Sequence, residues 1–149
     1  MNQQTHPDIE ELIRQANTIP SIVTTLGITF LSPASFEGEE GEVRATMPAD
    51  DATCQPFGYL SGGAMLALQE SLAGIGSVLR LPPALKPVGA SVTANHVSGK
   101  AKGGLVLGRA TLLHEGRSTH LWNVDVLDGE SGRLISTARV LNHIIPLQH

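Results

Sequence analysis

The spacing of apolar positions along the chain predicts two helices of different character. From Asp8 to Thr18 these positions recur at helical intervals, with acidic residues in the first turn, which predicts a short amphipathic helix. From Ser61 to Leu79 the residues are apolar or small on nearly every face, which predicts one long helix that ends at the prolines following it. A helix that is apolar all round is normally buried. We therefore expect the second helix to form the centre of the fold.

Segments rich in β-branched residues flank the long helix and predict strands. Two precede it, at Leu26–Leu31 and Gly41–Met47. Four follow it, at residues 88–97, 104–114, 119–127 and 134–145, and short turns rich in glycine separate them, as in an antiparallel meander. The order of elements predicts an α+β fold in which one antiparallel sheet wraps around the central helix. We expect residues 1–149 to be a single domain with its core at about residues 26–145.

Glu70 is the first candidate for chemistry. It is the only charged residue between Asp51 and Arg80, and it lies in the middle of the apolar helix. A carboxylate in an apolar interior is costly unless it is paired or protonated, so a chain rarely keeps one there for stability alone. The alternative is a buried carboxylate that neighbouring groups satisfy.

The start of the same helix predicts a second functional feature. Ser61 is suited to cap the helix, and Gly62 and Gly63 leave the first backbone N–H groups open to an approaching oxygen. Gly62 and Glu70 are eight residues apart in the sequence. That spacing is about 12 Å along a helix, so one helix cannot bring both groups to one carbonyl. If the two groups act together, they come from two subunits with antiparallel helices, and we expect a homo-oligomer.

Composition excludes several classes of protein. The net charge of −4 and the low aromatic content argue against a nucleic-acid-binding surface. Cys54 is the single cysteine, which excludes an internal disulfide and fits a reducing cytoplasm, and its thiol is expected to be structural. We expect no secretory signal and no membrane association, since no run reaches the roughly 18 apolar residues of a membrane span. The histidines lack ligand spacing, so we expect no metal.

Five short motifs carry a resemblance to a known family. They are Gln55–Ala64, Glu70-Ser71, Val88-Gly89, Ala94–Val97 and the turn His114–Ser118. In this order of elements they resemble the hotdog-fold acyl-CoA thioesterases. The most similar branch contains the phenylacetate-pathway, 4-hydroxybenzoyl-CoA and 1,4-dihydroxy-2-naphthoyl-CoA thioesterases. The resemblance implies a hotdog fold that assembles as a homodimer or as a homotetramer, a dimer of dimers.

The resemblance also implies an activity and a set of site residues. Glu70 would be the general base or nucleophile in hydrolysis of an aromatic or medium-chain acyl-CoA. The Gly62 backbone N–H of the other subunit would polarise the thioester carbonyl, beside Gln55 and Ser61. The coenzyme A arm would lie against Gly89 and against two segments, which comprise His96, Val97, Ser98, Gly99, Leu113, His114, Glu115, Gly116, Arg117 and Ser118. No cofactor is implied apart from the coenzyme A of the substrate.

Two positions depart from the pattern of these relatives. Ser61 stands where enzymes acting on naphthoyl substrates carry histidine, so a naphthoyl substrate is not implied. Gly74 stands where relatives often carry a hydroxyl one turn after the carboxylate.

Alternatives remain open for single residues and for the whole protein. Gln55 could bond only its own loop, Ser61 could act only as a cap, and His96 could be an ordinary strand histidine. A non-catalytic acyl-CoA-binding hotdog protein would not need Glu70. An acyl-CoA dehydratase or hydratase would use a loop histidine, which residues 50–60 lack.

Overall fold

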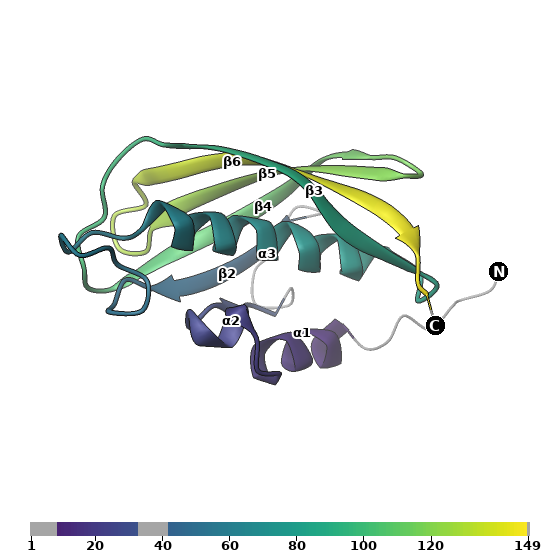
Figure 1. The fold of residues 1–149 in the computed structure, drawn as a ribbon, viewed down its shortest axis with the longest axis horizontal. Helices are drawn as coiled ribbons and strands as arrows, with labels where there is room; N and C mark the ends of the chain where they lie inside the picture. The colour runs from purple at the N-terminus through teal and green to yellow at the C-terminus, as the bar shows by residue number, and fades with distance from the viewer. Residues whose placement is uncertain (1–8, 33–41, 149) are drawn as a thin grey trace.

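One antiparallel sheet curls around a single long helix (Figure 1). The computed structural model describes residues 9–32 and 42–148. Its elements are α1 (Ile9–Thr18), α2 (Ile22–Thr25), β1 (Thr29–Phe30), β2 (Glu42–Pro48), α3 (Gly62–Arg80), β3 (Leu85–His96), β4 (Leu105–Glu115), β5 (Thr119–Asp128) and β6 (Leu134–Pro146). The predicted α+β hotdog architecture and both predicted helices are confirmed, while Asp8 and Gly41 lie outside the described residues.

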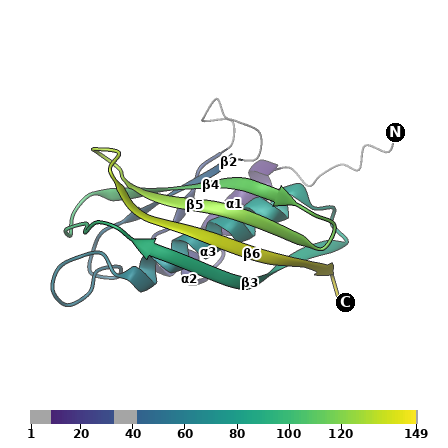
Figure 2. The ribbon, with the colours of Figure 1, turned by 90° about the horizontal axis from the view of Figure 1, so that it is seen from above.

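The strands lie in the order β1-β2-β4-β5-β6-β3, and Figure 2 shows the sequence from β2 to β3 from above. The predicted meander is therefore wrong for one strand, because β3 does not lie beside β4. Only β4, β5 and β6 follow one another, and β3 pairs with β6 from Leu85↔Pro146 to His96↔Ser136. The connection after β3 is not a tight hairpin, and it turns at Gly103 and Gly104, both with positive φ. The connection carries the chain across the end of the sheet to pair with β2.

The core lies between the concave face of the sheet and one side of α3. Alternate residues of β5, among them Trp122 and Val124, are fully buried, as are Leu68 and Leu72 of the helix. A Cβ atom on Gly76 would lie 2.7 Å from the Trp122 ring, so the absence of a side chain lets helix and sheet approach. This side of α3 is therefore buried against the sheet.

A buried polar cluster ties the end of α3 to β5 and β6. Ser77 Oγ accepts hydrogen bonds from Trp122 Nε1–H at 2.9 Å and from Asn142 Nδ2 at 3.1 Å. It also lies 2.9 Å from His120 Nδ1. Because two donors occupy its lone pairs, the hydroxyl donates to Nδ1, and the neutral imidazole keeps its proton on Nε2. Burial lowers the pKa of His120, and the nearby Glu115 acts in the opposite direction.

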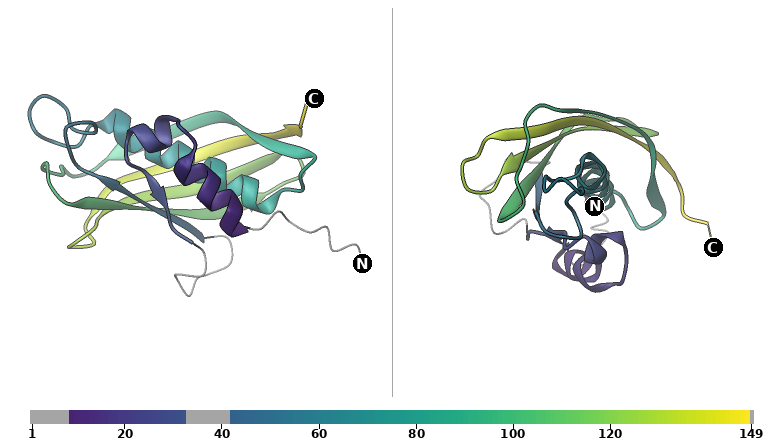
Figure 3. Two further views of the ribbon diagram at one scale, coloured as in Figure 1. Left: turned by 90° about the horizontal axis from the view of Figure 1, so that it is seen from below. Right: turned by 60° about the vertical axis from the view of Figure 1, so that its left-hand side comes forward.

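The N-terminal helices cover α3 on the side away from the sheet (Figure 3). The Asn17 side chain holds α1 against β1, donating to Phe30 O at 2.9 Å and accepting from Phe30 N at 2.8 Å. The helix α2 was not predicted. It ends at Thr25, and its C-cap Leu26 and the turn at Gly27 replace the first part of the predicted strand 26–31. Leu26 N–H bonds back to Ile22 O at 3.0 Å and Gly27 has φ +72°, so the strand starts only at Thr29.

The strand β3 forms one edge of the sheet. Within the described residues it pairs with β6 alone, so its outer row of N–H and C=O groups has no strand beside it. Residues 88–91 of this strand are all exposed. An edge of this kind is a template for pairing with a strand of another chain.

Candidate active site

The loop before α3 fixes the start of the helix. Ser61 N–H donates to Thr53 O at 2.9 Å, and Thr53 Oγ1 in turn donates to Pro48 O at 2.7 Å. Ser61 is the N-cap, and its Oγ accepts from Gly63 N–H at 3.1 Å. Within the described residues the Gly62 N–H has no acceptor. The cap thus occupies one glycine N–H and leaves the other, at the positive end of the helix dipole, for a ligand oxygen.

Gln55 lies in the same loop with its amide oriented by the backbone. The side-chain Oε1 accepts from the Phe57 backbone N–H. The backbone N–H of Gln55 donates to Tyr59 O at 2.8 Å. The loop-bonding alternative is therefore present in the structure. The Gln55 NH₂ group carries the only donors of the side chain and is the part that can donate to a substrate.

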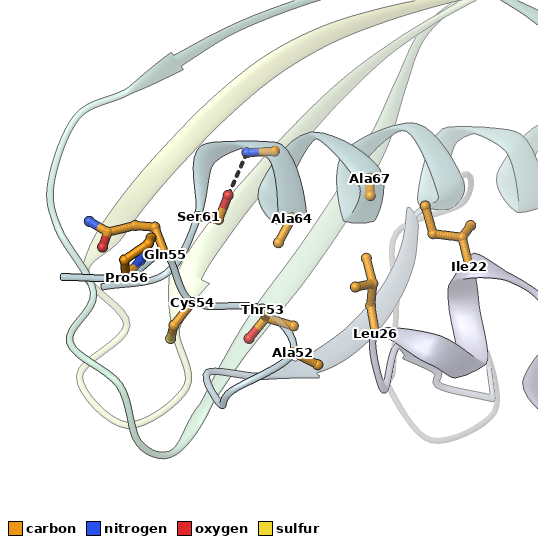
Figure 4. Close-up of a pocket in the computed structure, with 11 residues that line it drawn as sticks. Ile22, Leu26, Ala52, Thr53, Cys54, Gln55, Pro56, Ser61, Ala64 and Ala67 are labelled. Atoms are coloured by element: carbon orange, nitrogen blue, oxygen red, sulfur yellow. Dashed lines mark hydrogen bonds between the residues drawn. The ribbon is translucent and has the colours of Figure 1, made fainter. Parts of the chain in front are cut away.

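A cavity of about 450 Å³ opens beside the helix start (Figure 4). Gln55, Ser61 and Gly63 line one end of it, and Cys54 is also part of the lining. Ile22 and Leu26 point from the α2 segment toward α3 across this space. Polar side chains at the helix start and an apolar wall thus share one cavity, as in typical ligand sites.

Glu70 lines a second cavity of about 400 Å³ on the same side of α3. The two cavities share the residues Ile22, Gly63 and Ala67. Glu70 and the helix start therefore belong to one continuous surface.

The expectation that Glu70 is buried within the chain is wrong. The residue is exposed, and its Oε1 lies 2.6 Å from the position that a Cβ of Gly89 would occupy. The helix is buried only on the side that faces the sheet. On the other side Gly63, Ala67 and Ser71 line the cavity of Glu70, and their small side chains leave space instead of filling it. Gly89, predicted to contact coenzyme A, is thus placed directly against the candidate base.

A polar chain that the sequence did not reveal links the helix to His96. Gln69 is fully buried and donates to Ser136 Oγ at 2.9 Å, and Ser136 Oγ lies 2.9 Å from His96 Nδ1. Gln69 Oε1 has no hydrogen-bond partner within the described residues. His96 Nε2 lies 2.8 Å from the position of a Cβ on Gly62. The imidazole therefore packs against the helix start, and a side chain at residue 62 would collide with it.

The first predicted coenzyme A segment continues from His96 and is anchored to the start of β6. Val97 N–H donates to Ile135 O at 2.8 Å, and Ser98 Oγ donates to Leu134 O at 2.7 Å. Gly99 O accepts from Arg133 Nη2 at 3.1 Å. These contacts hold the segment beside the N-terminal end of α3.

The second predicted coenzyme A segment comprises the end of β4 and the turn that leads to β5. Leu113, His114, Arg117 and Ser118 are exposed there, and Gly116 N–H closes the turn on Thr119 O at 2.8 Å. Glu115 pairs with Arg80 at 2.7 Å, and that hydrogen bond holds the pKa of Glu115 below its usual value.

The two coenzyme A segments do not meet within one chain. His96 lies at Gly62, the first residue of α3, whereas Glu115 lies at Arg80, its last residue. The helix has 19 residues, which corresponds to a length of about 27 Å. The structure brings Gln55, Ser61, Gly62 and His96 together at one end and places the turn at the other end.

A search for metal and membrane features gave negative results for the described part of the chain. No group of three or more His, Cys, Asp or Glu side chains there could hold a metal ion. None of the described helices is long and apolar enough to cross a membrane.

A family model of the thioesterase superfamily matches residues 57–135, more than half of the sequence. This chain belongs to the thioesterase superfamily. Two members of the family show the extent of the similarity. The 1,4-dihydroxy-2-naphthoyl-CoA hydrolase of Escherichia coli is 39% identical over 103 residues, which cover 69% of this chain and 74% of the hydrolase. The proofreading thioesterase EntH of Cronobacter sakazakii is 33% identical over 140 residues, with 94% and 96% of the two chains covered.

The fold of the superfamily also matches a solved structure over the full chain. The crystal structure of the thioesterase HI1161 from Haemophilus influenzae superposes with a TM-score of 0.84 and 31% identity, covering 100% of this chain and 98% of that one.

Proposed function

We propose that this chain hydrolyses the thioester bond of an acyl-CoA with an aromatic or medium-chain acyl group. The observation that carries the proposal is the pair of adjoining cavities, one lined by Gln55 and Ser61 at the helix start and the other lined by Glu70. Membership of the thioesterase superfamily and the names of its relatives support the same reaction.

In this proposal the helix start polarises the thioester. The Gly62 N–H and the Gln55 NH₂ group donate to the carbonyl oxygen, and the helix dipole stabilises the negative charge that develops there. Ser61 caps the helix, with its Oγ accepting from the Gly63 N–H. Some relatives carry histidine at this position, and this chain has the Ser61 hydroxyl there in place of an imidazole.

Glu70 supplies the second half of the chemistry. As a general base, its carboxylate takes a proton from water while the water oxygen attacks the carbonyl carbon. The C–S bond then breaks, and the coenzyme A thiolate leaves and is protonated. As a nucleophile, Glu70 would instead form a mixed anhydride that water cleaves. Both routes consume one water and release a carboxylic acid and a thiol.

We further propose that each site is completed by a second copy of the chain. Gly62 and Glu70 are separated by about 12 Å along α3, so the Glu70 that serves a given carbonyl belongs to the partner. The same arrangement would bring the turn containing Arg117 to the His96 end of the other subunit, where its guanidinium could bind a coenzyme A phosphate. The open edge of β3, which carries Gly89 beside Glu70, supports pairing along this strand.

The first test is release of free coenzyme A from aromatic and medium-chain acyl-CoAs by wild type and by Glu70→Gln. We expect the variant to lose at least about 100-fold in kcat/KM, the range for loss of a general base. Glu130→Gln, an exposed carboxylate elsewhere, is the control and should keep full activity. Equal turnover by wild type and Glu70→Gln would contradict the catalytic role of Glu70. Saturable binding without any turnover would instead indicate an acyl-CoA-binding protein.

The shared site has its own test, which uses two inactive variants. Gln55→Ala and Glu70→Gln remove groups that we assign to different subunits of one site. Co-expressed at equal levels, they should recover about a quarter of wild-type activity, because half of the dimers are mixed and each mixed dimer has one intact site. No recovery in demonstrably mixed dimers would mean that both groups act from one chain.

A further inference from the structure

We propose that α2 is the acyl-binding wall of the site and that Ile22 sets the length of the apolar acyl group that it accepts. This inference rests on the proposed function and narrows its substrate class to acyl-CoAs whose acyl part is apolar and uncharged throughout.

The position of Ile22 is the first argument. Ile22 and Leu26 stand on α2, and together they face Ala64 and Ala67 of α3 across the cavity that holds Gln55 (Figure 4). Ile22 also lines the cavity of Glu70. An acyl group whose carbonyl lies at the helix start extends between these two walls.

The chemistry of the lining is the second argument. Small side chains, among them Ala52, Ala64 and Ala67, form much of the surface of the larger cavity. Its described lining contains no charged side chain. Such a surface favours hydrocarbon, and it offers no partner to a carboxylate at the far end of an acyl chain.

The exposure of Ile22 is the third argument. Ile22 is 59% exposed, so the core does not require it, although it lies over the candidate site. Its backbone is nevertheless fixed, since Ser21 and Thr24 form a capping box at the start of α2. Leu26, at the other end, packs against the core. An apolar side chain on a fixed support can act as a barrier of defined position.

The inference is tested with straight-chain acyl-CoAs from butyryl to dodecanoyl. Ile22→Ala should move the preferred acyl group to longer chains, and Ile22→Phe to shorter ones, each changing the ratio of kcat/KM for long and short substrates by about 10-fold. Ile19→Ala is the matched control, because Ile19 is 57% exposed but lines neither cavity. It should keep the wild-type length profile.

A second comparison tests the uncharged lining. Hexanoyl-CoA and adipoyl-CoA differ by a terminal carboxylate that would have to enter the cavity. We expect wild type to prefer hexanoyl-CoA by at least about 100-fold. A comparable rate with adipoyl-CoA would overturn the assignment of an apolar acyl group to this cavity.

Two results would overturn the role of Ile22. One is an unchanged length profile in both Ile22 variants. The other is a change in oligomeric state without a change in profile, which would make Ile22 a subunit contact. Failure of the proposed function gives a different result, namely no hydrolysis by wild type or no loss in Glu70→Gln. In that case the length profile is read from calorimetric binding of the same acyl-CoAs, where Ile22→Ala should again shift the preference and Ile19→Ala should not.

Discussion

The two faces of α3 use small residues for opposite purposes. On the face toward the sheet, Gly76 lets the Trp122 ring approach the helix, and the neighbouring Leu68 and Leu72 are fully buried. On the face toward the cavities, Gly63 and Ala67 leave open space beside Glu70. Both faces look apolar in the sequence. The difference shows that the same residue types can close a core or open a ligand site, depending on what lies opposite.

The largest expected difference between the two faces is in the free energy of unfolding that is lost when a leucine is shortened to alanine. Leu68→Ala should lower the free energy of unfolding by about 2–5 kcal/mol, because it leaves a cavity in the core. Leu66→Ala removes a half-buried leucine beside Glu70 and should cost about 1 kcal/mol or less. Urea unfolding at one fixed protein concentration measures both. Similar losses would mean that the two faces are equally packed.

A smaller effect is expected from a pair of glycines. Gly76→Ala should destabilise by about 1–3 kcal/mol, since the new methyl group collides with Trp122. Gly74→Ala should stabilise by about 0.5–1 kcal/mol, because no atom lies within 4 Å of the new Cβ and helical alanine is favoured over glycine. Thermal unfolding should therefore move in opposite directions for the two variants. A loss of stability in Gly74→Ala would show that this face is covered.

The polar cluster on the sheet face predicts a pH dependence of stability. Burial lowers the pKa of His120 below its ordinary value of 6.5, so the unfolded chain binds more protons in that range. The free energy of unfolding should be fully retained above about pH 6.5 and should fall as the pH drops toward the lowered pKa. Urea unfolding across this range should show the slope in wild type and a flatter one in His120→Gln. His143→Gln, at an exposed histidine, should keep the wild-type slope.

The sequence predicted the fold well where local signals mark the elements. The long helix was placed at Ser61–Leu79 and is observed at Gly62–Arg80, because a serine cap and a pair of prolines delimit it. The four residues of α2 are too few to show a period, so they were missed. The pairing of β3 with β6 was also missed, because the order of strands in the sequence does not determine which strands are neighbours in the sheet.

The candidate site could be predicted only in part. Motif similarity selected Gln55, Gly62 and Glu70. The structure places Gln55 and Glu70 in the linings of the two cavities and Gly62 at the first residue of α3. The exposure of Glu70 could not be predicted, because periodicity does not distinguish small residues that pack from small residues that leave space. Gln69 lies on the sheet-facing positions of α3, four residues after Met65, and that spacing was the available signal for its burial.

The open edge of β3 would make pairing with a second copy of the chain depend on the protein concentration. A strand edge that is left unpaired can recruit any other extended segment, so a lone copy of this chain is exposed to wrong partners until the right one covers it. If the right one is a second copy, both stability and turnover per chain rise with the number of copies present, and fall on dilution. A cell that makes few copies would then hold fewer working sites than its copy number suggests.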